Sequence, residues 1–274
     1  MGTLYLVATP IGNLEDTSPR AVRILSTVGL IAAEDTRHTQ KLLNHFAIHT
    51  KLTSYYEHNK LSKVDQVMSA LEKGDVALVS DAGTPALNDP GYELVCEALQ
   101  AGHPVSPVPG PCAPVAALVA SGLPTDSFLY LGYLPRKNSE RLRALSKASD
   151  YPFTLIFLET PHRLEAALQD IFSVLGDREI AVARELTKQH EEIFRGRLKE
   201  AQAHFSTHPP RGEFTLVISG KKSEATRWSD AALDEAILAA LKMDQPPARL
   251  ASRLAVESGW SRREIYQRIL QTQK

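Results

Sequence analysis

Short runs of apolar residues alternate with longer amphipathic stretches over residues 1–122. Apolar runs bounded by turn residues are typical of buried strands, and apolar residues spaced three and four apart indicate helices. The alternation of strand and helix favours a mostly parallel sheet covered by helices. The predicted strands are 3–8, 29–34, 51–55, 75–80 and 104–108, and the predicted helices are 19–28, 37–46, 62–73, 90–101 and 111–121.

The pattern changes after the polar turn at residues 121–127, which we take as a domain boundary. Two closely spaced predicted strands, 179–185 and 191–197, are typical of a hairpin, so a mixed sheet is expected. The predicted strands of this part are 128–134, 153–159, 179–185, 191–197 and 213–219, and the predicted helices are 139–148, 162–175 and 198–205.

A polar stretch at residues 220–228 indicates a linker before a helical segment at the end of the sequence. Helices are predicted there at 230–242, 247–258 and 262–271. The expected organisation is an N-terminal parallel-sheet α/β domain at 1–122, a C-terminal mixed α/β domain at 123–220 and a helical extension at 228–274.

Composition places the chain among globular proteins, with 43% hydrophobic and 23% charged residues over 274 residues. The net charge of −1 gives no overall attraction to nucleic acid, so any polyanion site must be a local patch. Cys96 and Cys112 form no CxxC pair and are expected to be reduced core residues. No apolar run reaches the ~18 residues that a membrane span needs, and no secretory signal is evident. We therefore expect a cytoplasmic protein without a membrane partner.

Three loops that follow predicted strands are rich in glycine and proline, at residues 8–16, 80–91 and 109–113. In open α/β sheets, ligands bind where strands end in such loops. Gly83 lets a ligand approach the backbone, and Pro85 stiffens the same loop. Together the loops predict one shared pocket for a small polar cofactor. The alternative is that each is an ordinary turn between strand and helix.

Glu34, Asp35 and Arg37 form the strongest candidate catalytic cluster, at the carboxyl end of a predicted strand. Two carboxylates beside a cation can shift a pKa and orient a hydroxyl group. The alternative is a helix N-terminus, in which Asp35 caps the helix at 37–46 and Arg37 pairs with Glu34.

A second candidate cluster contains Arg184, Glu185 and Lys188, with Glu185 as its catalytic residue. A solvated ladder of ion pairs is the competing interpretation. His58 and Asn59 are candidates for the substrate entrance, although a histidine in a polar loop more often has no special role. The HEEIF segment lacks the second histidine of a zinc helix, so no metal site is predicted.

Two segments carry local positive charge. Residues 136–147 hold five Lys or Arg against one Glu, and residues 245–274 hold six against two. Both are candidates for contacting RNA phosphates. Such contacts position the nucleic acid without reading its sequence. Solvated basic helix faces are the alternative.

Seven motifs occur in order along residues 3–220: ATPIGNL, AAEDTRHT, VSDAGTPALNDPG, PGPCA, FLETPHR, ARELTK and GEFTLVI. They closely resemble the small-subunit ribosomal RNA 2′-O-ribose methyltransferases of the tetrapyrrole methylase superfamily. The resemblance implies two α/β domains with the cofactor in the cleft between them. It also implies S-adenosylmethionine-dependent methylation of a cytidine ribose in the decoding centre of 16S ribosomal RNA, by a homodimer acting on RNA or the 30S particle.

The same resemblance implies which residues bind S-adenosylmethionine. For Asp81 the alternative is a loop-structuring Asx turn, and for Thr215 an ordinary strand residue. The implied cofactor-binding residues are Pro10, Asp81, Ala82, Gly83, Thr84, Leu87, Gly110, Cys112, Ala113, Glu159, Arg184 and Thr215.

Two other functions compete with this one. A tetrapyrrole or precorrin C-methyltransferase would keep the chemistry and change the substrate, but a corrin does not require the basic segments. A non-catalytic module that binds the cofactor or RNA is disfavoured by the charged residues retained in every loop.

Overall fold

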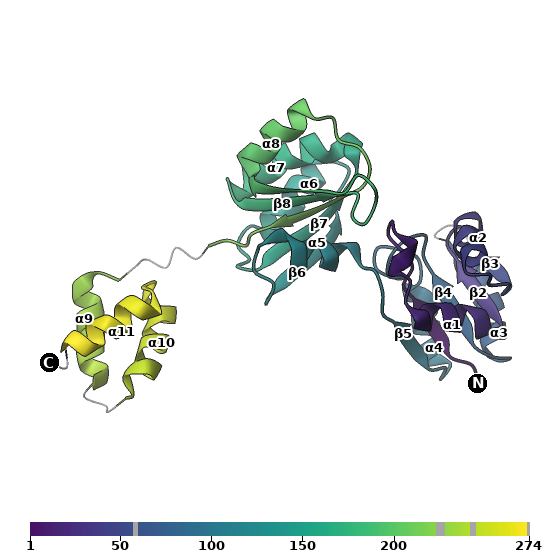
Figure 1. Cartoon of the computed structure of the whole chain (residues 1–274), viewed down its shortest axis with the longest axis horizontal. Coiled ribbons are helices and arrows are strands. Elements are labelled where there is room, and N and C mark those ends of the chain that lie inside the picture. The colour runs from purple at the N-terminus through teal and green to yellow at the C-terminus, as the bar shows by residue number, and fades with distance from the viewer. Residues whose placement is uncertain (57–59, 223–227, 242–244, 273–274) are drawn as a thin grey trace. The chain divides into compact units, whose positions relative to one another are not determined.

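The computed structural model describes residues 1–56, 60–222, 228–241 and 245–272. His58 and Asn59, the candidates for the substrate entrance, lie outside the described residues. The chain divides into two compact units, residues 1–221 and residues 222–274 (Figure 1). Within the described ranges, no helix has the length and apolar character that crossing a membrane requires.

The first sheet of the larger unit is parallel throughout, in agreement with the mostly parallel sheet predicted from the alternating pattern. Its strand order is β3-β2-β4-β1-β5. Its strands are β1 (Leu4–Val7), β2 (Leu30–Ala33), β3 (Leu52–Ser54), β4 (Val76–Val79) and β5 (Val105–Val108). The accompanying helices are η1 (Leu14–Asp16), α1 (Pro19–Thr27), α2 (Thr36–His45), α3 (Lys60–Leu71) and α4 (Tyr92–Gln100).

Both faces of this sheet are buried, which explains its continuous apolar strands. Successive side chains of a strand point to opposite faces. In β4, Ala77 and Val79 therefore pack with α1 and α2, whereas Val76 and Leu78 pack with α3 and α4. The carboxyl ends of the strands then share one edge of the sheet, where the loops rich in glycine and proline begin.

The second sheet is mixed, with order β6-β7-β10-β8-β9, and β8 and β9 form the predicted antiparallel hairpin. Its strands are β6 (Phe128–Tyr133), β7 (Thr154–Glu159), β8 (Glu179–Arg184), β9 (Glu192–Arg197) and β10 (Phe214–Ile218). The helices are α5 (Ala113–Ser121), α6 (Asn138–Ala148), η2 (Pro161–Arg163), α7 (Leu164–Leu175) and α8 (Leu198–Thr207).

Helix α5 follows the last strand of the first sheet but packs on the second sheet (Figure 1). Ala117 and Leu118 of α5 are buried against Ile156, Ala181 and Val217. The change of sheet therefore falls in the loop before α5, one helix earlier than the boundary predicted at residues 121–127. The PGPCA segment thus becomes the connection between the two halves of the unit.

The second unit contains α9 (Asp230–Leu241), α10 (Pro247–Ser258) and α11 (Arg262–Thr272) around a core of its own. Ser261 and Glu264 form a capping box at the start of α11, with hydrogen bonds of 3.2 and 3.0 Å. Arg268 pairs with Asp234 at 2.6 Å and lies 5.3 Å from the ring centre of Trp260. One of the basic residues of this segment therefore has a structural partner.

Candidate functional site

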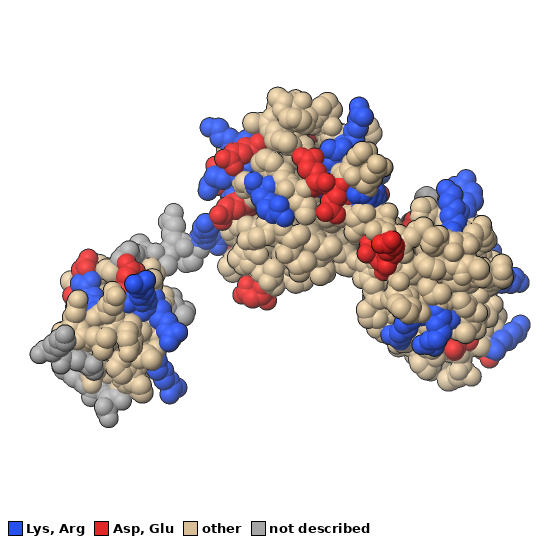
Figure 2. Space-filling model, in the orientation of Figure 1, with Lys and Arg blue, Asp and Glu red and all other residues tan. Residues whose placement is uncertain are grey.

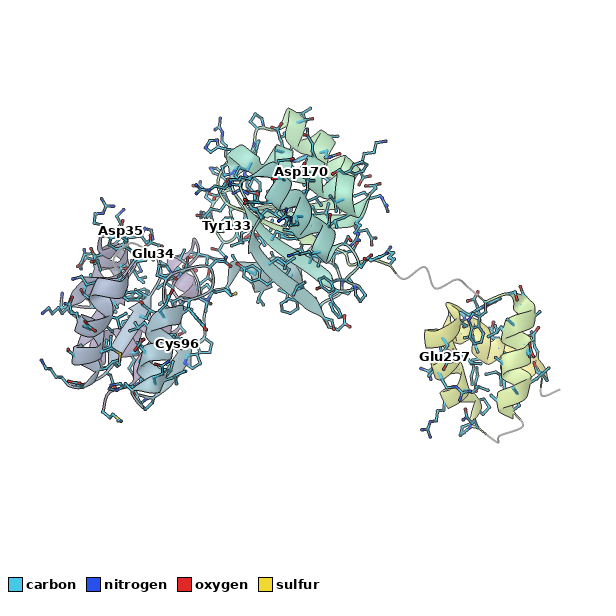
Figure 3. All side chains as sticks on the ribbon, turned by 180° about the vertical axis from the view of Figure 1, so that it is seen from behind. Glu34, Asp35, Cys96, Tyr133, Asp170 and Glu257 are labelled. Carbon is cyan, nitrogen blue, oxygen red and sulfur yellow. The ribbon has the colours of Figure 1, made fainter. Side chains whose placement is uncertain are left out.

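A cavity of about 240 Å³, here called the central cavity, lies where loops of the first sheet meet strands of the second. Figure 3 shows Glu34 and Tyr133 in the two halves of the larger unit that contribute to it. Its lining consists of Ile11, Glu34, Asp81, Ala82, Gly83, Thr84, Leu87, Asn88, Asp89, Cys112, Ala113, Pro114, Tyr130, Tyr133, Leu158, Glu213, Phe214 and Thr215.

The loop after β4 is held in place by a two-way backbone bridge. The N–H of Thr9 donates to the carbonyl of Gly83 at 2.9 Å, and the N–H of Gly83 donates to the carbonyl of Thr9 at 3.0 Å. Thr84 adds a hydrogen bond of 3.1 Å from its hydroxyl to the carbonyl of Pro111. Because both polar backbone groups of Gly83 are used, a ligand would meet its Cα rather than its amide.

The end of this loop has an unusual backbone conformation. Ala86 and Asn88 have φ values of 67° and 64°, which residues with a Cβ adopt at some energetic cost. Asn88 packs against Gly132 on β6, whose own φ is 65°. Such strain persists only where the surroundings impose it, and here it carries Asn88 and Asp89 to the cavity wall.

Carboxylates dominate the electrostatics of the central cavity, since Glu34, Asp81, Asp89 and Glu213 all line it. Burial, together with the charge of Asp89, raises the pKa of Glu34 above its ordinary value. Burial also raises the pKa of Asp89, against the effect of a hydrogen bond from Ser80. A cation placed here would relieve the repulsion among these groups.

Asp81 connects two strands rather than shaping its own loop. Its carboxylate accepts the N–H of Asp35 at 2.9 Å, and its own N–H donates to the Glu34 carboxylate at 3.4 Å. The Asx turn considered from the sequence is therefore not what its side chain forms. This reciprocal contact holds Glu34 beside the DAGTP loop.

Two tyrosines on β6 line the cavity and were missed by sequence reasoning. Tyr130 and Tyr133 are three residues apart, so a regular strand would point them to opposite faces. The pairing of β6 with β7 shifts register between them, and the positive φ of Gly132 lies in that irregularity. The Tyr130 hydroxyl is buried and has no hydrogen-bond partner among the described residues.

Of the catalytic cluster predicted near residue 35, only Glu34 reaches the central cavity. Asp35 is the N-cap of α2, with its carboxylate 2.8 Å from the N–H of Arg37. The Arg37 side chain is 89% exposed and pairs with Asp35 at 2.7 Å, so the predicted Arg37–Glu34 pair is wrong. These contacts with Arg37 hold the pKa of Asp35 well below its usual range.

The second predicted cluster is a network of ion pairs. Lys188 binds Glu185 at 2.9 Å, and Arg184 binds Glu192 at 3.1 Å. Glu185 also accepts the N–H of Glu213 at 3.0 Å, which positions the Glu213 segment at the cavity. Although burial opposes it, the bond from Lys188 lowers the pKa of Glu185. Glu185 thus supports the wall and does not form part of the described lining.

Most of the cofactor residues implied by the resemblance come together at the central cavity. Asp81, Ala82, Gly83, Thr84, Leu87, Cys112, Ala113 and Thr215 line it. The described lining does not include Pro10, Gly110, Glu159 and Arg184. Gly110 instead allows the connecting loop to pass close to Ala8, because a Cβ at Gly110 would lie 3.0 Å from that of Ala8.

Glu159 is buried with another partner. Its carboxylate pairs with Arg163 at 3.1 Å and accepts the N–H of Thr160 at 2.8 Å. Burial raises the pKa of Glu159 despite these contacts. The pair anchors the start of α7 under the loop that follows β6, since Arg163 also donates to the carbonyl of Leu134.

Neither cysteine is a fully buried core residue, in contrast to the prediction. Both are free thiols of intermediate exposure, and Cys112 lies at the N-cap of α5 on the cavity wall. In the part of the chain that the structure describes, no group of His, Cys, Asp and Glu side chains is arranged to hold a metal ion.

The basic segment at residues 136–147 is less accessible than its sequence indicates. Arg141 is buried and pairs with Asp170, and Lys137 pairs with Glu140 at 3.3 Å. Figure 2 shows Asp and Glu among the Lys and Arg side chains on the visible face of this half. Arg136, Arg143 and Lys147 remain as candidates for phosphate contact.

Comparison with known proteins identifies what the chain is similar to. A family model described as Tetrapyrrole (Corrin/Porphyrin) Methylases matches residues 3–202. The chain is 46% identical to a protein of Halalkalibacterium halodurans, over 97% of this chain and 93% of that protein. It is 47% identical to one of Synechocystis, over 97% of both chains, and 44% identical to one of Escherichia coli O157:H7, over 99% and 96%. All three are named ribosomal RNA small subunit methyltransferase I.

Solved structures share the fold at low identity. A uroporphyrin-III C-methyltransferase from Thermus thermophilus matches with a TM-score of 0.54 at 22% identity, covering 81% of this chain and 95% of that one. A cobalt precorrin-4 methyltransferase matches with a TM-score of 0.59 at 16% identity, covering 79% and 94%.

Proposed function

The chain belongs to the tetrapyrrole methylase family, and from this premise we propose that it methylates small-subunit ribosomal RNA. The proposed reaction transfers a methyl group from S-adenosylmethionine to the ribose 2′-oxygen of a cytidine in that RNA. The observation that carries the proposal is the central cavity, which gathers carboxylates from both halves of the larger unit and aromatic side chains from the second sheet.

The chemistry of this cavity fits S-adenosylmethionine. The cofactor carries a sulfonium and an ammonium cation, and four carboxylates line the cavity. Tyr130, Tyr133 and Phe214 add aromatic surface that can contact a cation or an adenine ring. The buried hydroxyl of Tyr130, which has no partner among the described residues, offers a hydrogen bond to a ligand.

The residues of the chain bind and orient the reactants. When bound, S-adenosylmethionine supplies an activated methyl group, so orientation can provide much of the rate enhancement. Asp81 and Asp89 would balance the positive charges of the cofactor, and Leu87 and Leu158 would exclude water from it.

Glu34 is the residue best placed to act on the ribose hydroxyl. Its raised pKa makes it a better proton acceptor than an exposed carboxylate, and it lines the cavity directly. Asp35 is a poor base, because its carboxylate is already bound to Arg37. We therefore propose that Glu34 holds the proton that leaves the 2′-oxygen.

The test is methyl transfer from tritiated S-adenosylmethionine to three substrates: small ribosomal subunits, free small-subunit RNA and a precorrin. Labelling of subunits or RNA at a 2′-oxygen, mapped by nuclease digestion, is the expected result. Transfer to the precorrin alone would identify the tetrapyrrole C-methyltransferase. Binding of cofactor and RNA without transfer to any substrate would identify a non-catalytic module.

We also propose that the protein works as a homodimer in the cytoplasm, where ribosomes are assembled. Helix α5 supports self-association, because Val115 and Val119 lie one turn apart and are 45% and 69% exposed. Sedimentation of the wild type and of Val119→Asp tests this. We expect a dimer that the charged variant dissociates, and a monomeric wild type would contradict it.

A further inference from the structure

A second cavity, of about 210 Å³, lies beside the central cavity and is here called the α2 cavity. It lies between the loop that follows β1, helix α2 and the end of β4. Asp81 lines both cavities, so the two share a wall at this carboxylate. The ATPIGNL and EDTRHT motifs contribute most of the α2 cavity, and Pro10 and Asp81 are its lining residues that the resemblance also implied for the cofactor.

The lining of the α2 cavity combines apolar walls with buried polar groups. Pro10, Leu14 and Leu42 provide the apolar surface. Thr9, Thr39 and Ser80 line it as well and are each at most 3% exposed. This mixture suits a flat ligand that packs between apolar side chains and forms hydrogen bonds at its edge.

The buried hydroxyl of Thr39 is available to form a hydrogen bond with a ligand in the α2 cavity. Thr39 is 3% exposed, and its Oγ1 has no hydrogen-bond partner in the described part of the chain. Buried polar atoms normally have a partner, so one without any requires an explanation. A hydroxyl both donates and accepts, so Thr39 could serve a ring carbonyl or a ring nitrogen of a ligand.

Lys41 places a cation at the edge of the α2 cavity, beside the imidazole of His38. Lys41 and His38 are exposed residues of α2 that also line the cavity. Figure 2 shows Lys and Arg side chains at the end of this half where Figure 1 places α2. A ligand with an anionic group outside the cavity would therefore find a counter-charge.

We propose that the α2 cavity binds the base of the RNA nucleotide to be methylated, a pyrimidine turned out of its stack. This inference rests on the proposed function. Its apolar walls and its buried hydroxyl groups suit the flat, polar-edged ring of a base. Proteins that read RNA in this way pack an unstacked base in a pocket and bind its edge.

The wall that the two cavities share at Asp81 would bring the two reactants next to each other. A base in the α2 cavity places its own ribose at the wall formed by Asp81, next to the central cavity. Its phosphate is then available to Lys41. The two cavities thus hold the methyl donor and the base separately, and the ribose between them would meet the methyl group where the cavities adjoin at Asp81.

Leu14→Trp tests the proposal by filling the mouth of the α2 cavity. Leu14 is 41% exposed, so a larger side chain there does not disturb the core. Leu99→Trp is the matched control, because Leu99 is 57% exposed on α4 and lines neither of these two cavities. Two quantities are measured for each full-length protein: kcat/KM for small ribosomal subunits, and the Kd for S-adenosylmethionine by calorimetry.

We expect Leu14→Trp to lower kcat/KM at least tenfold with an unchanged Kd for the cofactor, and Leu99→Trp to change neither. Thr39→Val, which keeps shape and removes the hydroxyl, should lower kcat/KM about two- to tenfold. Unchanged kcat/KM in both α2-cavity variants would overturn the proposal. A wild type without activity on subunits or RNA would instead contradict the proposed function itself.

Discussion

The side-chain amide of Asn88 lies directly against the backbone of Gly132, joining the loop after β4 to the irregular part of β6. A Cβ built on Gly132 would come within 2.5 Å of Asn88 Nδ2. A side chain at 132 would require the Asn88 side chain to shift, and the φ of 65° also favours glycine. This contact positions both walls of the central cavity, since Asn88 belongs to one and Tyr133 to the other.

Gly132→Ala should therefore weaken binding of S-adenosylmethionine at least tenfold, because Asn88 and Tyr133 must move apart. The left-handed backbone adds a destabilisation of about 1–2 kcal/mol. Gly122→Ala is the matched control, with a φ of 82° and open space around its Cβ. Calorimetry and thermal unfolding should show similar destabilisation in both variants and lost affinity only in Gly132→Ala. Equal affinities would mean that this contact does not shape the site.

Ligand binding should stabilise the protein without any added metal. At 100-fold excess over its Kd, S-adenosylmethionine is expected to add about 2.7 kcal/mol to the free energy of unfolding. Thermal unfolding at millimolar cofactor, with and without a chelator, measures this. The absence of a thermal shift in both conditions would contradict the hypothesis that the protein binds S-adenosylmethionine.

This stabilisation should grow with pH, because Glu34 and Asp89 have raised pKa values in the folded protein. The ordinary pKa values of Glu34 and Asp89 are 4.5 and 3.8. As the pH rises above these values, the two carboxyl groups lose their protons in the unfolded chain before they do so in the folded protein. The ligand-free protein therefore loses stability as pH rises through the raised pKa values. The cationic cofactor binds the ionised form better, whereas its demethylated product, which lacks the sulfonium charge, should show a weaker dependence. An identical pH dependence for the two ligands would contradict the role of the carboxylates.

Gly83→Val should abolish cofactor binding and destabilise the fold. Gly83 has a φ of 86°, and a Cβ there would lie 3.4 Å from Cγ2 of Ile11 on the cavity wall. Gly102→Val is the matched control. Gly102 has a similar left-handed φ of 81°, but it lies outside the lining of the central cavity. Both variants should unfold at lower temperature, but only Gly83→Val should lose affinity in calorimetry. Unchanged affinity would place the cofactor elsewhere.

Glu34 and Asp35 should behave differently when each is replaced. Glu34→Gln is expected to lower kcat about 10²- to 10⁴-fold, the usual contribution of a general base. Asp35→Ser keeps an N-cap oxygen for α2 and should retain activity, because its carboxylate faces Arg37 rather than the cavity. Single-turnover methylation measures both. Equal loss of activity in the two variants would indicate that Asp35 also takes part in the reaction.

The helical second unit should contribute RNA affinity and not chemistry. Removal of residues 222–274 should weaken RNA binding and leave cofactor affinity unchanged, because the central cavity lies entirely within the first unit. Each lost phosphate contact should reduce the slope of log K against log salt by roughly 0.7–0.9. Arg262→Ala with Arg263→Ala should reproduce part of this effect. Equal salt slopes for the full and shortened proteins would leave this unit as a packing or dimerisation element.

Local patterns in the sequence determined the elements, the two sheets and the loops that contribute to the central cavity. The apolar run at residues 76–79 indicated a strand buried on both faces, and it packs on two cores. The loops at residues 8–16, 80–91 and 109–113 could be found because turns depend on nearby glycine and proline. Resemblance to a family added what local patterns cannot supply, the cofactor and the RNA substrate.

Only the tertiary structure decided which side chains meet. The register shift in β6 brings Tyr130 and Tyr133 to one cavity, although their spacing assigns them to opposite faces. Packing assigned α5 to the second sheet and buried Glu159 against Arg163. Asp35, adjacent to Glu34 in sequence, caps a helix outside the cavity. Each outcome depends on contacts between residues distant in the chain, whereas strand and helix periodicities report only on near neighbours.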